Sequence, residues 1–182
     1  MQETGPDRIR YFAAAPWPKA LKVSSALGTA LIIGIGMAAY RAIPVPAGFT
    51  HYFGLGIALL LPAILCLSLL FTVTGYIVSS TELAVQRLLW ATQIPLSGLK
   101  SVWIEPSVCK GSVRIIGNAG LFGFTGLYYS SRLGRYRLFA TDLANSVVLE
   151  FPNRTVVITP AEAHAFVEHF HHIIPHTRES ME

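Results

Sequence analysis

The sequence predicts a two-helix transmembrane hairpin followed by a mainly-β small barrel or sandwich that ends in an amphipathic helix. Three observations indicate this fold class. Two long runs without formal charge lie close together, at residues 23–40 and 53–74. Short strand-like segments separated by turn residues follow from residue 75 onward. Near the C-terminus, apolar residues recur at helical spacing.

Composition agrees with a membrane protein that carries one further domain. Hydrophobic residues make up 52% of the 182 residues and charged residues 13%, whereas soluble domains carry about a quarter charged residues. The net charge of +4 is small and dispersed, so we expect no nucleic-acid partner. Cys66 and Cys109 lie in different halves of the chain and predict no disulfide framework.

The first apolar run is long enough to cross a bilayer, since a helix over residues 23–40 would cover about 27 Å. The run exceeds the ~7–15 apolar residues of a signal peptide, and a second apolar run follows at once, so a retained helix is favoured. We expect a flexible N-terminal segment at 1–20, a hairpin at 21–74 with helices at about 21–41 and 52–74, a cytoplasmic domain at 75–175 and a tail at 176–182.

The first helix carries a ridge of small residues at four-residue spacing, made up of Ala26, Ala30, Gly34 and Ala38. Such a ridge allows another helix to approach closely in lipid. The second helix offers Gly54 and Ala58 one turn apart, so packing within the hairpin is favoured, with self-association through the same ridge as the alternative. Neither run contains an ionisable residue at depth, which argues against a pump or channel.

Positive charge predicts the orientation of the hairpin. Arg8, Arg10, Lys19 and Lys22 precede the first helix, whereas Arg41 stands alone in the connecting turn. Because Lys and Arg stay preferentially in the cytoplasm, we expect the N-terminus there. Two crossings then return the chain to the cytoplasm, where the rest of it folds.

Eight strand segments are expected after the hairpin, at residues 76–79, 83–88, 94–96, 102–104, 126–129, 135–140, 147–151 and 155–159. The last two flank a Pro-Asn-Arg turn and predict a hairpin. The closing helix is expected to begin with Thr159 as N-cap and Pro160 in its first position, with Glu162 completing a capping box. Its buried stripe is expected to comprise Phe166, Phe170, Ile173 and Ile174.

Three parts of this second half have a recognisable order. They are the segment 76–96 that leaves the membrane, the glycine-rich stretch 117–128, and the segments 133–142 and 156–160 that lead into the closing helix. Together they resemble the pleckstrin-homology-like (PH-like) domains of small bacterial membrane proteins. The resemblance implies a PH-like fold at a bacterial inner membrane, and it implies no particular activity.

The glycine-rich stretch contains a glycine at every third position, comprising Gly117, Gly120, Gly123 and Gly126. This spacing matches neither the dinucleotide fingerprint nor the Walker A loop. We therefore expect the glycines to serve the backbone, with Leu121, Phe122 and Phe124 inserted into the core or against lipid. The alternative is a membrane-dipping or partner-binding loop.

Arg132, Arg135 and Arg137 form the densest basic group. Arg135 and Arg137 share one face of a strand, because side chains alternate. These arginines either form a solvated strand face, which is favoured, or contact anionic lipid headgroups under the membrane.

No catalytic site, cofactor or metal site is expected. His164, Glu168 and His172 lie four residues apart on the closing helix, but no HExxH motif or cysteine pair accompanies them. The sequence favours a non-catalytic membrane protein whose PH-like domain acts as an interaction or assembly module, with a homo-oligomer or another membrane protein as partner. The alternative is an accessory subunit of a transporter or membrane enzyme, docked through the small-residue ridge.

Overall fold

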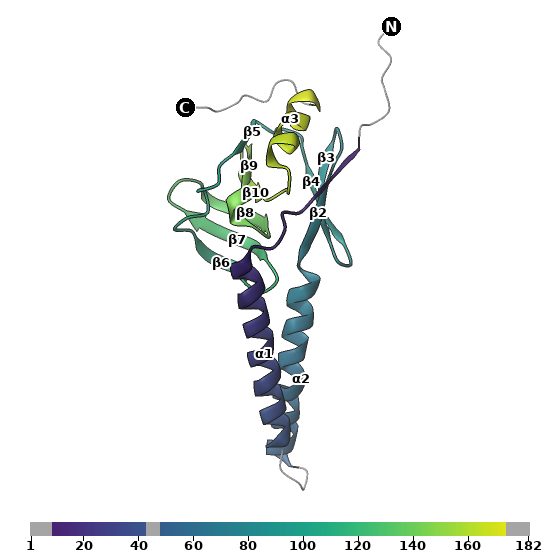
Figure 1. Ribbon diagram of the computed structural model, residues 1–182, viewed down its shortest axis with the longest axis vertical. Coiled ribbons are helices and arrows are strands. Elements are labelled where there is room, and N and C mark those ends of the chain that lie inside the picture. Colours follow the sequence, from purple (N-terminus) through teal and green to yellow (C-terminus); the bar gives the residue numbers. More distant parts are fainter. Residues whose placement is uncertain (1–8, 43–47, 174–182) are drawn as a thin grey trace.

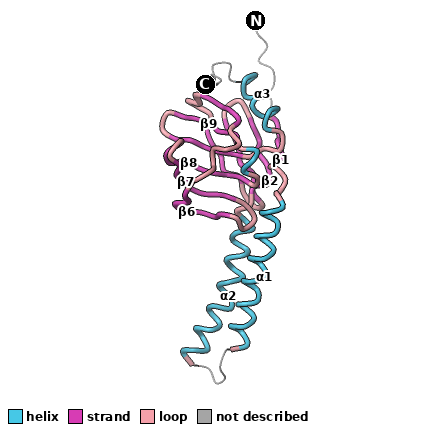
Figure 2. Tube along the Cα trace, turned by 60° about the vertical axis from the view of Figure 1, so that its left-hand side comes forward, coloured by secondary structure: helices cyan, strands magenta, loops and turns pink. Residues whose placement is uncertain are grey.

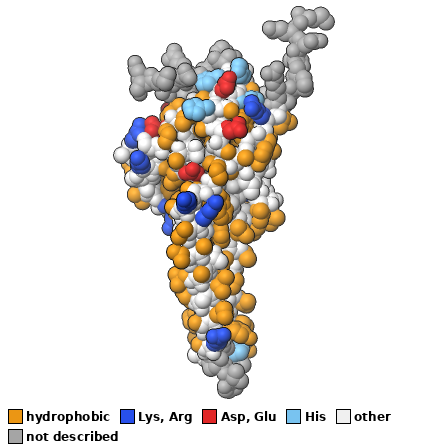
Figure 3. Space-filling model, viewed as in Figure 1, with side chains coloured by type: hydrophobic (Ala, Val, Ile, Leu, Met, Phe, Trp, Pro, Cys, Tyr) orange, Lys and Arg blue, Asp and Glu red, His pale blue; other side chains and the backbone are white. Residues whose placement is uncertain are grey.

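The computed structural model describes residues 9–42 and 48–173, which form an apolar shaft of two helices beneath a β-rich domain (Figure 1). The helices α1 (Lys19–Arg41) and α2 (Phe49–Leu70) lie side by side in both views of the backbone (Figures 1 and 2). Both are long and apolar enough to cross a membrane. In the most apolar 18-residue stretch of each helix, only 6% and 0% of the residues are buried within the protein. Core helices of soluble proteins bury such surface, so the outward-facing apolar side chains in Figure 3 fit a lipid environment.

The buried and half-buried positions of the two helices are not the ones that the small-residue spacing selected. The buried and half-buried positions that share a face of α1 are Ser25, Thr29, Ile32, Gly36 and Ala39, and those on α2 include Gly54, Ala58, Leu61, Leu65 and Ser68. The expected ridge of Ala26, Ala30, Gly34 and Ala38 is exposed, so the prediction that it packs within the hairpin is wrong. A Cβ on Gly34 would meet nothing within 4 Å, whereas one on Gly36 would lie 4.0 Å from the Ala58 carbonyl oxygen. Because α1 carries small residues on several faces, spacing alone could not choose between them.

A four-stranded antiparallel sheet stands directly on the hairpin. Its strands, in spatial order, are β1 (Arg10–Ala13), β2 (Val73–Val78), β3 (Glu82–Arg87) and β4 (Ala91–Pro95). The expectation of a flexible segment over 1–20 is thus wrong for β1, whose Phe12 is 5% exposed and packs 4.9 Å from the Phe166 ring. The second helix also ends earlier than expected, because Val73 and Thr74 already belong to β2.

A six-stranded sheet faces the first one. Its order is β5 (Ser101–Ile104), β9 (Val147–Phe151), β10 (Arg154–Ile158), β8 (Gly134–Ala140), β7 (Phe124–Ser130) and β6 (Val113–Ala119). Only β10 and β8 run parallel. The expected hairpin of the last two strands is present, with Arg154 opposite Phe151. The edge strand β6 was not expected.

The main hydrophobic core lies between the two sheets and is closed by α3 (Ala163–Ile173). Phe166 and Phe170 are fully buried there, as the apolar stripe predicted, while Ile174 lies outside the described residues. The expected helix start at Thr159 and Pro160 is wrong. Pro160 instead forms an isolated bridge with Ala14, and this pairing delays the helix to Ala163.

Candidate functional site

The junction between the hairpin and the β domain holds most of the chain's unusual features. The strand before α1 pairs with the strand after α2, with Phe12 opposite Tyr76. Ala15 adds a further attachment, since its N–H donates to the Thr159 carbonyl at 2.8 Å and its carbonyl accepts a bond from the Thr141 hydroxyl at 2.5 Å. Both ends of the hairpin therefore enter the same folded domain.

The loop between β6 and β7 adds a polar contact to α1. The Ser24 hydroxyl donates to the Gly120 carbonyl at 2.9 Å, and the N–H of Phe122 donates to the Ser25 Oγ at the same distance. Ser25 is only 3% exposed, so its contact is shielded from water. The glycine-rich loop is thus hydrogen-bonded to the start of the first membrane helix.

Apolar contacts accompany these hydrogen bonds. The Phe122 ring lies 6.1 Å from the Trp17 ring, and the Leu121 side chain sits so close to Gly28 that a Cβ there would lie 3.2 Å from it. Phe122 has a φ of 62°, an uncommon conformation for a bulky residue. The structure thus places Leu121 and Phe122 against the hairpin, and it places Phe124 at the edge of a core cluster on the outer face of the six-stranded sheet.

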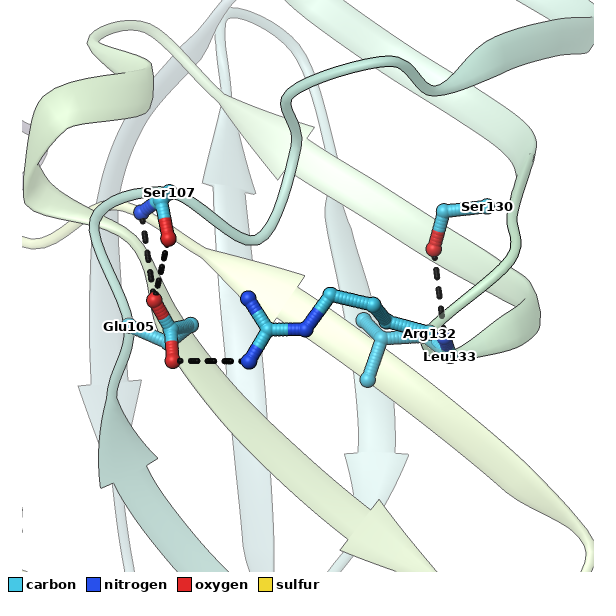
Figure 4. Close-up of polar contacts among 5 residues, drawn as sticks. All are labelled: Glu105, Ser107, Ser130, Arg132 and Leu133. Atoms are coloured by element: carbon cyan, nitrogen blue, oxygen red, sulfur yellow. Dashed lines mark hydrogen bonds and ion pairs between the residues drawn. The ribbon is translucent and has the colours of Figure 1, made fainter.

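The three arginines singled out by the sequence do not form one group. Arg132, in the turn after β7, pairs with Glu105 at 3.4 Å while remaining 62% exposed (Figure 4). The Ser107 hydroxyl donates to Glu105 at 2.6 Å. This bond is the main reason that the pKa of Glu105 is lowered, and the charge of Arg132 adds to it. Arg135 and Arg137 are both exposed on one face of β8, as strand alternation predicted.

Arg137 lines a cleft of about 640 Å³ between the end of α2, the β3–β4 pair and strands β6 to β8, which we call the interfacial cleft. Its walls are formed by Leu67, Ser68, Phe71, Arg87, Thr92, Ile116, Gly117, Asn118, Thr125, Gly126, Leu127, Arg137 and Phe139. Arg87 and Arg137 are the only charged residues among them. No local sequence pattern points to Arg87, because Phe71 and Phe139 beside it come from distant parts of the chain.

The Arg87 guanidinium lies among three aromatic rings. Its Cζ is 5.0 Å from the ring centre of Phe71, 5.6 Å from that of Trp90 and 5.4 Å from that of Phe139. Its Nε is buried and has no hydrogen-bond partner within residues 9–42 and 48–173. Burial lowers the pKa of Arg87 from its ordinary value. The rings hold this cation in place by cation–π contact but offer its buried Nε no hydrogen bond.

Exposed apolar side chains flank the interfacial cleft. In the turn between β3 and β4, Leu88 and Leu89 are 54% and 72% exposed. On the edge strand, Val113, Ile115 and Ile116 are at least half exposed, and Figure 1 shows β6 beside the domain end of the shaft. Apolar surface of this kind marks contact with a membrane or a partner.

A metal site does not form on the closing helix in the part of the chain that the structure describes. No three His, Cys, Asp or Glu side chains there converge to hold a metal ion. Glu168 and His172 lie 4.0 Å apart as an exposed pair on successive turns. Asp142 accepts a hydrogen bond from the Ala144 N–H at 3.1 Å, so it stabilises a turn.

Comparison with known families agrees with this fold. Residues 74–173 match a family described as Bacterial PH domain, and the match covers more than half of the chain. This chain belongs to the bacterial PH domain family. Among curated proteins none matches the chain. The matched PH domain begins within β2, so β1 and the membrane hairpin lie outside it.

Proposed function

We propose that this chain is a non-catalytic membrane protein whose PH domain acts as an interaction or assembly module at the cytoplasmic face of the bacterial inner membrane. The double attachment of the domain supports this function most strongly. β1 and β2 tie the two ends of the hairpin together, and the 120–123 loop is hydrogen-bonded to α1. A domain held this way presents the same faces to its neighbours in the membrane plane.

The distribution of charge supports the cytoplasmic placement. Arg10, Lys19 and Lys22 lie at the domain end of the hairpin, and Arg41 lies at the opposite end of α1. Lys and Arg are enriched on the cytoplasmic side of membrane proteins. Pairing of β1 with β2 requires the N-terminal strand and the PH domain to share one side of the bilayer.

A surface for lateral partners lies on α1. The small-residue ridge of Ala26, Ala30, Gly34 and Ala38 faces away from α2 and is exposed along the membrane span. Small residues on a lipid-facing surface allow close helix contact. The partner is either a second copy of this chain or another membrane protein. The second case makes the chain an accessory subunit of a transporter or membrane enzyme.

Association in native membranes tests the proposal. The full-length chain would be extracted gently, and any co-purifying protein identified with its stoichiometry. We expect the double substitution Ala30→Leu and Gly34→Leu to abolish association while leaving the fold unchanged, because both positions are exposed. Ala63→Leu places the same bulk on the exposed surface of α2 and should leave association intact.

The proteins recovered in this experiment decide between the two kinds of partner. A reproducible transporter or enzyme partner would make this chain a subunit, and recovery of copies of the chain alone would make it a homo-oligomeric scaffold. A monomer without any partner in native membranes would overturn the assembly function. If association survived the ridge substitutions, the interface would lie on the PH domain and not on α1.

A further inference from the structure

The interfacial cleft concentrates positive charge without a compensating carboxylate. Arg87 and Arg137 line it, and no Asp or Glu is among its lining residues. Within the described ranges 9–42 and 48–173, neither arginine takes part in an ion pair. Two cations facing one cleft repel each other, and a bound anion would relieve that repulsion.

Arg87 is held in a position suited to anion binding. The rings of Phe71, Trp90 and Phe139 surround its guanidinium at 5.0–5.6 Å. A planar guanidinium can donate two parallel hydrogen bonds to the oxygens of a phosphate group, and fixing it beforehand reduces the entropy lost on binding. Its Nε is buried out of reach of a ligand, so the terminal nitrogens of the half-buried Arg87 side chain are the donors available to an anion.

The position of the cleft favours a lipid as the source of a bound phosphate group. Leu67 and Ser68 belong to the last turn of α2 and Phe71 caps it, so the cleft opens where the membrane span meets the domain. Lipid headgroups occupy that level of a bilayer. The apolar walls, which include Ile116 and Leu127, suit the glycerol and upper acyl carbons of a lipid. A volume of about 640 Å³ lies within the ordinary range of ligand sites.

We propose that the interfacial cleft binds an anionic phospholipid of the leaflet next to the PH domain. Arg87 and Arg137 donate hydrogen bonds to its phosphate oxygens, and the apolar walls contact its glycerol and upper acyl chains. This site requires the hairpin to span the bilayer but requires no protein partner. Its failure in an experiment is therefore distinct from failure of the assembly function.

Lipid titration followed by native mass spectrometry tests the site on the full-length chain in detergent micelles. Phosphatidylglycerol should bind more tightly than phosphatidylcholine, whose choline cation would face two arginines. Arg137→Gln should weaken phosphatidylglycerol binding roughly tenfold, the effect of one charged hydrogen bond. Arg137 is exposed, so this variant should fold normally. Arg87→Gln should weaken binding at least as much.

Matched controls separate this site from general attraction to charge. Arg132→Gln and Arg135→Gln remove exposed arginines outside the cleft and should leave the affinity unchanged. Equal losses in all four variants, or no loss in Arg137→Gln, would overturn the proposal. Glycerol 3-phosphate lacks acyl chains and should not compete at the lipid's concentration. Effective competition would show a soluble phosphate site and overturn the lipid assignment.

Discussion

The N–H of Phe122 donates a hydrogen bond to the Ser25 hydroxyl oxygen at 2.9 Å, and this bond joins the PH domain to the first membrane helix across 97 positions of sequence. Ser25 is 3% exposed and lies at the level where α1 leaves the domain. Together with the bond from Ser24 to Gly120, it ties the loop between β6 and β7 to α1.

Loss of this hydrogen bond should loosen the loop. We expect Ser25→Ala to lower the free energy of unfolding by about 1 kcal/mol, and amide hydrogen exchange over residues 119–124 to become faster. Thr29→Val is the matched control, because the Thr29 hydroxyl has no hydrogen-bond partner in the described chain. Unchanged exchange in Ser25→Ala would show that apolar contacts alone hold the loop.

Tyr76 joins the two sheets through its hydroxyl group, which donates to the Phe139 carbonyl at 2.7 Å and accepts from the Thr159 N–H at 3.1 Å. Tyr76→Phe leaves both backbone groups buried without a partner. The free energy of unfolding should fall by roughly 2–4 kcal/mol, as measured by denaturant titration in detergent. Tyr129→Phe, at a side chain that is 48% exposed, should change it by less than about 0.5 kcal/mol.

Alkaline pH should destabilise the protein through deprotonation of Tyr76. Burial raises the pKa of Tyr76 from 10.0 to about 12, so the folded protein keeps this proton at pH values where the unfolded chain releases it. Stability should therefore be retained below about pH 10 and fall as the pH rises from 10 toward 12. Denaturant titrations across that interval should give a shallower fall for Tyr76→Phe. Identical slopes in the two proteins would contradict this assignment.

The pairing of β6 with β7 depends on two facing glycines. Gly117 and Gly126 have φ values of 125° and 140°, and a Cβ on Gly117 would collide with the backbone of Thr125. Gly117→Ala should cost about 3 kcal/mol or more of unfolding free energy. Gly111 also has a positive φ, 70°, but faces open space, so Gly111→Ala should cost only about 1 kcal/mol. If thermal unfolding gave similar losses of stability for Gly117→Ala and Gly111→Ala, the positive φ alone, and not a collision of the Cβ, would explain the cost at Gly117.

Removal of the Ser107 hydroxyl should change the pKa of Glu105 more than removal of the Arg132 charge does. The hydrogen bond from Ser107 contributes most to the lowering of this pKa, and the exposed Arg132 contributes less. Ser107→Ala should raise the pKa of Glu105 more than Arg132→Ala does, in a carbon-13 NMR titration of labelled glutamate carboxyl groups. A larger rise in Arg132→Ala would reverse the order of the two causes.

Sequence patterns predicted the parts of this structure that depend on neighbouring residues. The two apolar runs, the hairpin of β9 and β10, and the buried stripe of α3 each follow from local periodicity. β1 could not be predicted, because four residues such as Arg10–Ala13 form a strand only when a distant partner is present. The same reason hid the interfacial cleft, where Arg87 meets Phe71 of the hairpin and Phe139 of the other sheet.

Pairing of β1 with β2 has a consequence for biogenesis. During translation β1 leaves the ribosome before either membrane helix, whereas its partners in β2 and at Pro160 follow both crossings. In the nascent chain β1 therefore remains unpaired until the hairpin has been inserted. A chain inserted with only one crossing would leave β1 and β2 on opposite sides of the bilayer. The four-stranded sheet can therefore be completed only in a chain whose two helices have both been inserted correctly.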